Sequence, residues 1–125
     1  MLRKLLWLAG AGTLGTFSRY ALSGLVQRWT GAAFPWGTLA VNVVGCFAAG
    51  LLWVLAETRL ALSATVRTAA LVGFLGAFTT FSAFMLETGQ LMRDAQWLRA
   101  SLNILLQNGI GLVALLAGFA VARRI

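Results

Sequence analysis

Histidine is absent from this chain of 125 residues, and cysteine, proline and acidic residues are scarce: there is one cysteine, one proline and three aspartate or glutamate residues. Zinc and iron sites usually take several ligands from histidine, cysteine and carboxylates, so we expect no such site within one chain. The single thiol, Cys46, excludes an intramolecular disulfide. It lies inside an apolar stretch, where we interpret it as a small packing residue.

Charged residues are also few. They make up 10% of the chain, whereas hydrophobic residues make up 60%, and a soluble domain typically has about 25% charged residues. A spanning helix needs about 20 predominantly apolar residues. Four stretches qualify, at 5–26, 36–56, 68–85 and 98–122. The sequence therefore predicts an all-α membrane protein, in which a single domain, 1–125, crosses the membrane with four transmembrane helices.

Basic residues give the chain a formal net charge of +7. They are scattered at the ends of the apolar stretches, so we interpret them as headgroup anchors and reject nucleic-acid binding. The distribution favours a cytoplasmic N-terminus only weakly, and insertion in both orientations is conceivable. Arg3 and Lys4 precede an apolar run, as in a signal peptide. The run continues past Arg19 without a convincing cleavage site, so we interpret it as the first transmembrane helix.

The segment 73–84, with the sequence GFLGAFTTFSAF, is unusual for a membrane helix. It combines two glycines, two adjacent threonines and a serine, and glycine and adjacent β-branched residues weaken a helix. We therefore expect the third helix to be interrupted at mid-depth. Interrupted membrane helices expose backbone groups that usually serve an ion or a substrate. The segment thus indicates a conduction pathway.

Polar side chains inside the apolar stretches are costly to leave unpaired. Asn42 lies one turn beyond Thr38, and Asn103 lies one turn before Gln107. Each amide could join two helices by hydrogen bonds, which is common in membranes, or could line an ion path with N–H donors. Arg19 likewise has two interpretations. It could anchor the helix end at the membrane surface, or line a water-filled entrance that attracts anions.

The phenylalanines of the third stretch form a ladder. Phe74, Phe78 and Phe81 follow helical spacing, and Phe84 comes three residues later. A packing stripe is the ordinary interpretation. Alternatively, the weakly positive ring edges could approach an anion without trapping it.

No carboxylate lies in the first, second or fourth stretch, whereas a cation pathway more naturally has buried carboxylates. Four thin helices can hardly enclose a pathway alone, so we expect an oligomer.

Three motifs occur in one order along the chain: GTLGTFSRY at 12–20, PWGTLAVNVVG at 35–45 and GFLGAFTTFSAF at 73–84. Together they resemble the signatures of the Fluc (CrcB) fluoride channels, and the resemblance covers essentially the whole chain. It implies a homodimer of dual topology, with two antiparallel subunits in the cell (inner) membrane and two pores. The implied function is passive, selective export of cytoplasmic fluoride, which gives fluoride resistance. No enzyme activity is implied.

The resemblance also implies a set of site residues. The backbone carbonyls of Gly76 and Thr79, from both subunits, would bind one structural sodium ion at the break in the third helix. The fluoride pore would be lined by aromatic edges, an amide and hydroxyls from Phe81, Phe84, Asn42, Thr80 and Ser82. Ala83 stands where the family often has a threonine, so one hydroxyl of the motif is missing here.

Related chains often carry tyrosine or serine along the fourth helix, where this chain has Asn103 and Gln107; we assign both to the pore. Arg19 and Glu87 are assigned to a vestibule, although a solvated carboxylate at a helix end would explain Glu87 equally well.

Two other functions compete with the channel. A small dual-topology multidrug exporter needs a glutamate in its first helix, where this chain has Arg19. A membrane scaffold that transports nothing would not explain the three ordered motifs.

Overall fold

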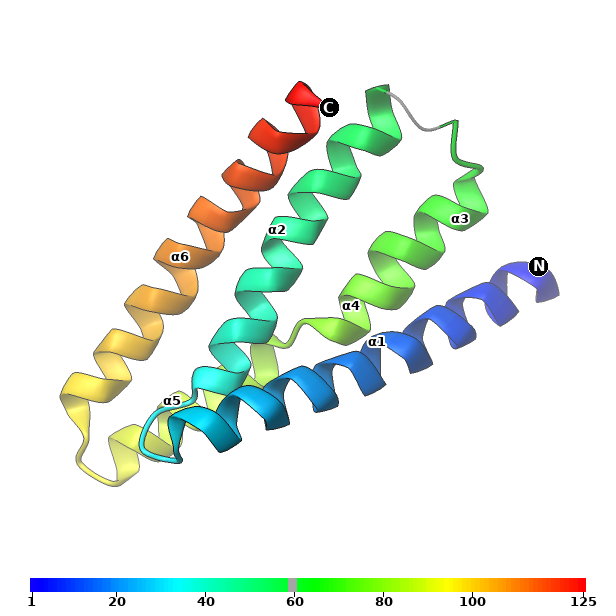
Figure 1. Cartoon of the computed structure of the whole chain (residues 1–125). Coiled ribbons are helices and arrows are strands. Elements are labelled where there is room, and N and C mark those ends of the chain that lie inside the picture. Colours follow the sequence, from blue (N-terminus) through cyan, green and yellow to red (C-terminus); the bar gives the residue numbers. More distant parts are fainter. Residues whose placement is uncertain (59–60) are drawn as a thin grey trace.

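The computed structural model describes residues 1–58 and 61–125, and all the regular structure in these ranges is helical (Figure 1). The first two helices are α1 (Leu2–Thr30) and α2 (Trp36–Thr58). A run of short elements follows, made of α3 (Ala64–Thr68), the π-helical η1 (Ala69–Phe74) and α4 (Leu75–Phe78). Two residues separate α4 from α5 (Phe81–Arg93), and the last helix is α6 (Trp97–Arg124).

Within the two described ranges, three helical stretches are long and apolar enough to cross a membrane: Trp36–Thr58, Ala64–Arg93 and Trp97–Arg124. The second, third and fourth stretches predicted from sequence are therefore confirmed as apolar helices of spanning length. The first behaves differently. α1 has 29 residues, but Arg19 and several glycines and threonines make it less apolar than the other three.

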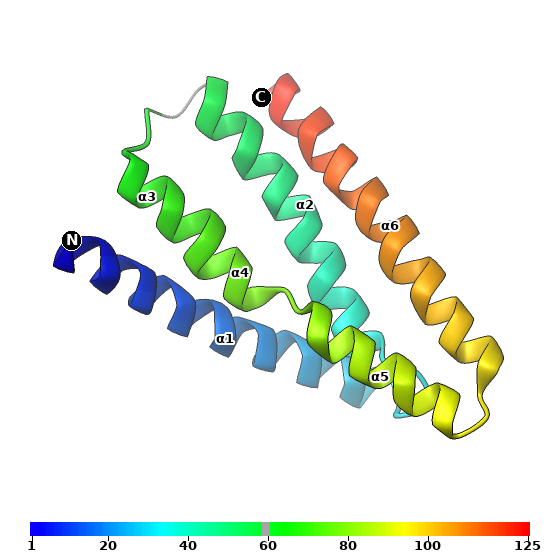
Figure 2. The same ribbon diagram turned by 180° about the vertical axis from the view of Figure 1, so that it is seen from behind.

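The helices pack as two pairs. α2 packs along α6, and α1 packs along η1 and α4, with fewer contacts between the pairs (Figures 1 and 2). Glycines let the backbones come close at both contacts, α2 with α6 and α1 with η1. A Cβ atom at Gly50 would overlap the Leu115 carbonyl oxygen, and one at Gly15 would overlap the Phe74 carbonyl oxygen. Small residues at such contacts let membrane helices approach backbone to backbone.

The connection between α1 and α2 is held by the side chain of Gln27. Its Nε2 donates to the carbonyl oxygens of Gly31 and, at 2.9 Å, Phe34. Its Oε1 accepts the Gly37 backbone N–H at 3.0 Å. Gly31 has a φ of 83°, a conformation that glycine adopts without strain. These contacts fix the start of α2, and therefore the positions of the polar side chains along its first turns.

The stretch Ala64–Arg93 loses its helical backbone at two residues near its midpoint. Thr79 has φ −81° and ψ 160°, and Thr80 has φ −151° and ψ 115°, so both are extended. The Thr80 hydroxyl caps α5 by accepting the Ala83 N–H at 3.2 Å, a role in which threonine is common. One turn before the interruption, on the other side of α4, the π-helical η1 widens the helix, a feature often found at functional sites.

Candidate ion-binding site at the helix interruption

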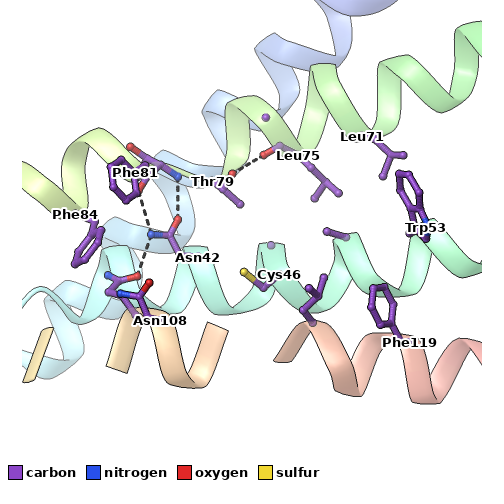
Figure 3. A pocket seen from close by; sticks show the side chains of 16 residues that line it. Asn42, Cys46, Trp53, Leu71, Leu75, Thr79, Phe81, Phe84, Asn108 and Phe119 are labelled. Atoms are coloured by element: carbon purple, nitrogen blue, oxygen red, sulfur yellow. Dashed lines mark hydrogen bonds between the residues drawn. The ribbon is translucent and has the colours of Figure 1, made fainter. Parts of the chain in front are cut away.

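An open cavity of about 570 Å³ lies between α2, α6 and the interrupted helix (Figure 3). We call it the interhelical cavity. Polar groups gather at the end near the interruption, whereas Trp53 and Phe119 lie at the other end. Its lining consists of Asn42, Gly45, Cys46, Ala49, Trp53, Leu71, Leu75, Gly76, Thr79, Thr80, Phe81, Phe84, Gln107, Asn108, Leu115 and Phe119.

Asn42 uses its whole side-chain amide to hold the interruption. Its Oδ1 accepts the Thr80 backbone N–H at 2.8 Å, and its Nδ2 donates to the Thr80 carbonyl oxygen at 3.0 Å (Figure 3). Nδ2 also donates to Gln107 Oε1, at 3.0 Å. An asparagine side chain has two N–H bonds. Because both are engaged within the protein, Asn42 has no amide hydrogen left for a bound ion.

Two backbone carbonyls at the interruption have lost their helical donors. In a continuous helix, the Gly76 carbonyl oxygen would accept the Thr80 N–H, but this N–H goes to Asn42. The Thr79 carbonyl oxygen would accept the Ala83 N–H, which goes instead to the Thr80 hydroxyl. Gly76 and Thr79 both line the interhelical cavity. A Cβ atom at Gly76 would meet no atom within 4 Å, so the chain is open on that side.

Gln107, in α6, carries a buried N–H donor that has no partner in residues 1–58 and 61–125. The Thr80 N–H can only donate and the Thr80 carbonyl can only accept. These two bonds therefore identify the Asn42 atom that faces the Thr80 N–H as Oδ1 and the atom that faces the Thr80 carbonyl as Nδ2. The Gln107 atom that faces Asn42 Nδ2 must then be the acceptor, Oε1. Gln107 Nε2 consequently lacks a partner among the described residues, although the residue is only 8% exposed and lines the cavity.

The four phenylalanines separate into two pairs. Phe81 and Phe84 line the interhelical cavity, with ring centroids 5.6 Å apart and planes at 73°, so an edge meets a face. The two residues differ in exposure, because Phe81 is 71% exposed and Phe84 only 3%. Phe74 and Phe78 instead stack in parallel, 5.7 Å apart, and Phe78 is buried. The ladder is therefore part packing stripe and part cavity wall.

The two hydroxyls assigned to the pore lie together, 3.4 Å apart, but have different surroundings. Thr80 lines the cavity, and its hydroxyl serves as the cap of α5. Ser82 is exposed on the first turn of α5 and does not line the cavity.

Asn103 lies away from the cavity, although it shares a helix face with Gln107. It is completely buried, and its Nδ2 donates to the Thr88 hydroxyl at 2.9 Å. Thr88 in turn donates to the Phe84 carbonyl oxygen at 2.7 Å. These contacts join α5 to α6, as expected for a hydrogen bond between helices, while Asn103 Oδ1 has no partner among the described atoms.

Glu87 and Arg19, which we assigned to a vestibule, lie outside the interhelical cavity. Glu87 Oε1 accepts the Thr38 hydroxyl at 2.6 Å, and its buried Oε2 has no partner in the described part of the chain. It lines a separate hollow of about 420 Å³ beside the α1–α2 connection, together with Asp94 and Arg99. Arg19 is half-buried in α1 and does not line this hollow.

Gly45, the last residue of the second motif, also belongs to the site. A Cβ atom there would overlap the Thr79 side-chain methyl group. Gly45 therefore lets the interruption approach α2 closely enough for Asn42, about one turn earlier, to reach Thr80. The signal was present in the second motif, which ends with a glycine three residues after its asparagine.

Comparison with known proteins gives matches over nearly the whole chain. Residues 6–119 match the family described as CrcB-like protein, Camphor Resistance (CrcB). The chain is 55% identical over 125 residues to a protein of Desulforapulum autotrophicum named fluoride-specific ion channel FluC, covering all of both chains. A protein of the same name from Nitrosococcus oceani is 52% identical over 123 residues, 98% of each chain. With three apolar spanning helices, the protein is a multi-pass membrane protein, and it belongs to the CrcB family.

Proposed function

We propose that this protein is a fluoride-selective channel that exports cytoplasmic fluoride passively and thereby gives fluoride resistance. The observation that carries the proposal is the match over the full length of both chains to a protein named fluoride-specific ion channel, at 55% identity. The local chemistry of the interhelical cavity supports it independently. An anion pathway needs donors without a strong fixed charge, and none of the residues that line this cavity is charged.

Fluoride is small and holds water tightly, so a pore must replace its hydration shell with donors. We assign one donor to Gln107 Nε2, which is buried and has no partner in the described part of the chain. The ring edges of Phe81 and Phe84 would supply weak positive potential without trapping the ion. Asn42, whose hydrogens are engaged, would act in the pore by orienting Gln107 and Thr80. We place Ser82 and Asn103 beside this path, rather than on the cavity wall.

The interruption also suits a structural sodium ion, bound by the carbonyl oxygens of Gly76 and Thr79. These are the two carbonyls whose helical donors are diverted. The negative end of the α4 backbone dipole favours a cation there, and the positive end of α5 favours an anion. When bound, sodium would neutralise the converging carbonyl dipoles; Asn42 and Thr80 hold the backbone in the shape that exposes them.

In one subunit, only Gly76 and Thr79 among residues 76–79, whose carbonyls lose their helical donors, line the cavity, so we propose that a second copy completes the site and encloses the cavity. A two-fold axis in the membrane plane would bring two interruptions together, because each lies near the middle of its spanning stretch. It would place four carbonyl oxygens around one ion. In this antiparallel homodimer each subunit crosses the membrane four times, α1 included, with its third helix broken. We place Arg19 and Glu87 in its vestibules.

Export needs no energy source other than the membrane potential. An inside-negative potential contributes about 2.3 kcal/mol per charge per 100 mV toward anion exit. Fluoride enters cells as undissociated HF, which ionises in the more neutral cytoplasm. A selective passive pore is therefore sufficient for resistance.

Ion efflux from liposomes that contain the purified full-length protein tests the proposed function. Vesicles loaded with potassium fluoride or potassium chloride are diluted into salt-free medium with valinomycin, and an ion-selective electrode records the anion released. We expect rapid fluoride efflux and negligible chloride efflux. Equal efflux of the two anions would contradict selectivity. Efflux of neither anion would contradict the channel and favour a membrane scaffold.

A further inference from the structure

A second groove lies between the N-terminal half of α1 and the adjoining elements α3 and η1. Its volume is about 680 Å³. Small residues of both helices line it, namely Gly10, Ala11, Ala69 and Ala70. We call it the N-terminal groove. It uses Ala70 and Phe74 of η1, whereas the interhelical cavity uses Leu71, Leu75 and Gly76, so the two hollows lie on different faces of this segment.

Gly10 leaves the middle of the α1 wall of the groove without a side chain. A Cβ atom at Gly10 would meet nothing within 4 Å, so the glycine is not needed for helix packing. Gly15, one and a half turns further along α1, is different, since a Cβ there would overlap the backbone of η1. Next to the open space at Gly10, the side chains of Leu6 and Leu14 are 64% and 60% exposed. An apolar channel is thus left on a membrane-embedded surface.

A basic side chain lies at one end of this apolar groove. Arg3 is among its lining residues, and Lys4 follows it in sequence. Among residues 1–58 and 61–125, neither takes part in an ion pair, whereas Arg67 pairs with Glu57 at 3.9 Å. Trp7, which also lines the groove, is 52% exposed, and indole rings favour the membrane interface. The end of the groove at Arg3 and Trp7 therefore has the residue types that lie at the level of the lipid headgroups.

The length of the groove matches one lipid leaflet. From Arg3 to Leu14 the helix advances eleven residues, about 16 Å at the rise of an α-helix. The hydrocarbon core of a bilayer is about 30 Å thick, so one leaflet is about 15 Å deep. Because α1 is inclined to α2 and α6 (Figures 1 and 2), a chain that lies in the groove with its charged head at Arg3 would run obliquely toward the middle of the bilayer near Leu14 and Phe74.

We propose that the N-terminal groove binds one acyl chain of an anionic phospholipid, with the lipid phosphate on Arg3. The apolar lining suits the hydrocarbon chain, and the unpaired guanidinium suits the phosphate as a bidentate partner. A second copy of this chain is a poorer occupant, because it would bury Arg3 against a protein that has only three acidic residues. The inference depends only on insertion in a membrane and not on fluoride conduction.

Native mass spectrometry of the detergent-solubilised full chain tests the proposal, with dioleoyl-phosphatidylglycerol and dioleoyl-phosphatidylcholine titrated separately. Gly10→Leu fills the groove, and Arg3→Gln removes the charge. Gly24→Leu is the matched control, since a Cβ at Gly24 also meets nothing within 4 Å and the position is outside the groove. Arg28→Gln, at the other end of α1, controls for charge.

We expect Gly10→Leu to weaken phosphatidylglycerol binding about tenfold, by excluding about two methylene groups. Arg3→Gln should reduce the preference for phosphatidylglycerol about fivefold, while both controls bind as the unaltered protein does. Equal affinity for the two lipids, or binding that Gly10→Leu leaves unchanged, would overturn the proposal. So would loss of the dimer mass in Gly10→Leu with lipid binding intact, since the groove would then be a protein interface. If Gly10→Leu does not fold, the Arg3→Gln result decides.

Discussion

Replacing Asn42 with alanine removes three hydrogen bonds at once, two to the Thr80 backbone and one to Gln107. Hydrogen bonds between membrane helices contribute about 0.6 to 1.7 kcal/mol each, so the loss amounts to about 2–5 kcal/mol. The Thr80 N–H would be free to bond the Gly76 carbonyl again, which would extend α4 through the interruption. We therefore expect Asn42→Ala to destabilise the fold and to impair fluoride efflux together.

The free energy of unfolding, measured by titration with a denaturing detergent and followed by circular dichroism, checks this expectation. Asn108→Ala is the matched control. Asn108 lines the same cavity, but its amide donates only to the Ile104 carbonyl one turn earlier, at 2.7 Å. Its loss should cost less than about 0.5 kcal/mol. If the two variants lose equal stability, the role assigned to Asn42 is wrong.

Three further substitutions probe the same site. Gln107→Met keeps the length of the side chain but removes the donor, together with the Oε1 acceptor of Asn42 Nδ2, and we expect fluoride efflux to fall about 10- to 100-fold with the proposed dimer intact; unchanged efflux would mean that Nε2 does not face the ion. Phe81→Ile and Phe84→Ile should each strongly reduce efflux without dissociating the proposed dimer, as measured by ion electrode and size-exclusion chromatography; normal efflux would assign both rings to packing. Gly45→Ala should cost about 1–3 kcal/mol of unfolding free energy, because the new methyl group overlaps Thr79. Gly109→Ala, where a Cβ meets no atom within 4 Å, is its control and should be neutral.

The interruption is predictable from sequence because its causes are local. Two adjacent threonines lie between Phe78 and Phe81, and a threonine can cap the helix that follows it. The spanning stretches are predictable for the same reason, since apolar length is a property of composition. α1 is the exception, because Arg19 and its small polar neighbours make its apolarity marginal. The structure accordingly finds three clearly apolar spanning helices.

The division of roles among the amides was not predictable, because it depends on contacts between distant parts of the chain. Asn42 meets Thr80 across 38 residues and Gln107 across 65. Sequence spacing placed Asn103 and Gln107 on one helix face and treated them alike. Only packing against α5 separates them, since Asn103 bonds Thr88 there, whereas Gln107 bonds Asn42 and keeps a donor without a partner among the residues that the structure describes.

The central claim is that a sodium ion at the interruption supports a fluoride pore. Fluoride efflux from liposomes made with and without sodium tests it most directly, because the assay measures whether fluoride conduction requires sodium. The protein is purified and reconstituted either in sodium salts or in salts of a large organic cation, and fluoride and chloride efflux are recorded from both preparations. The proposed mechanism predicts rapid fluoride efflux only from the sodium preparation, and negligible chloride efflux from both. Fluoride efflux that does not depend on sodium, or chloride efflux as fast as fluoride efflux, would contradict it.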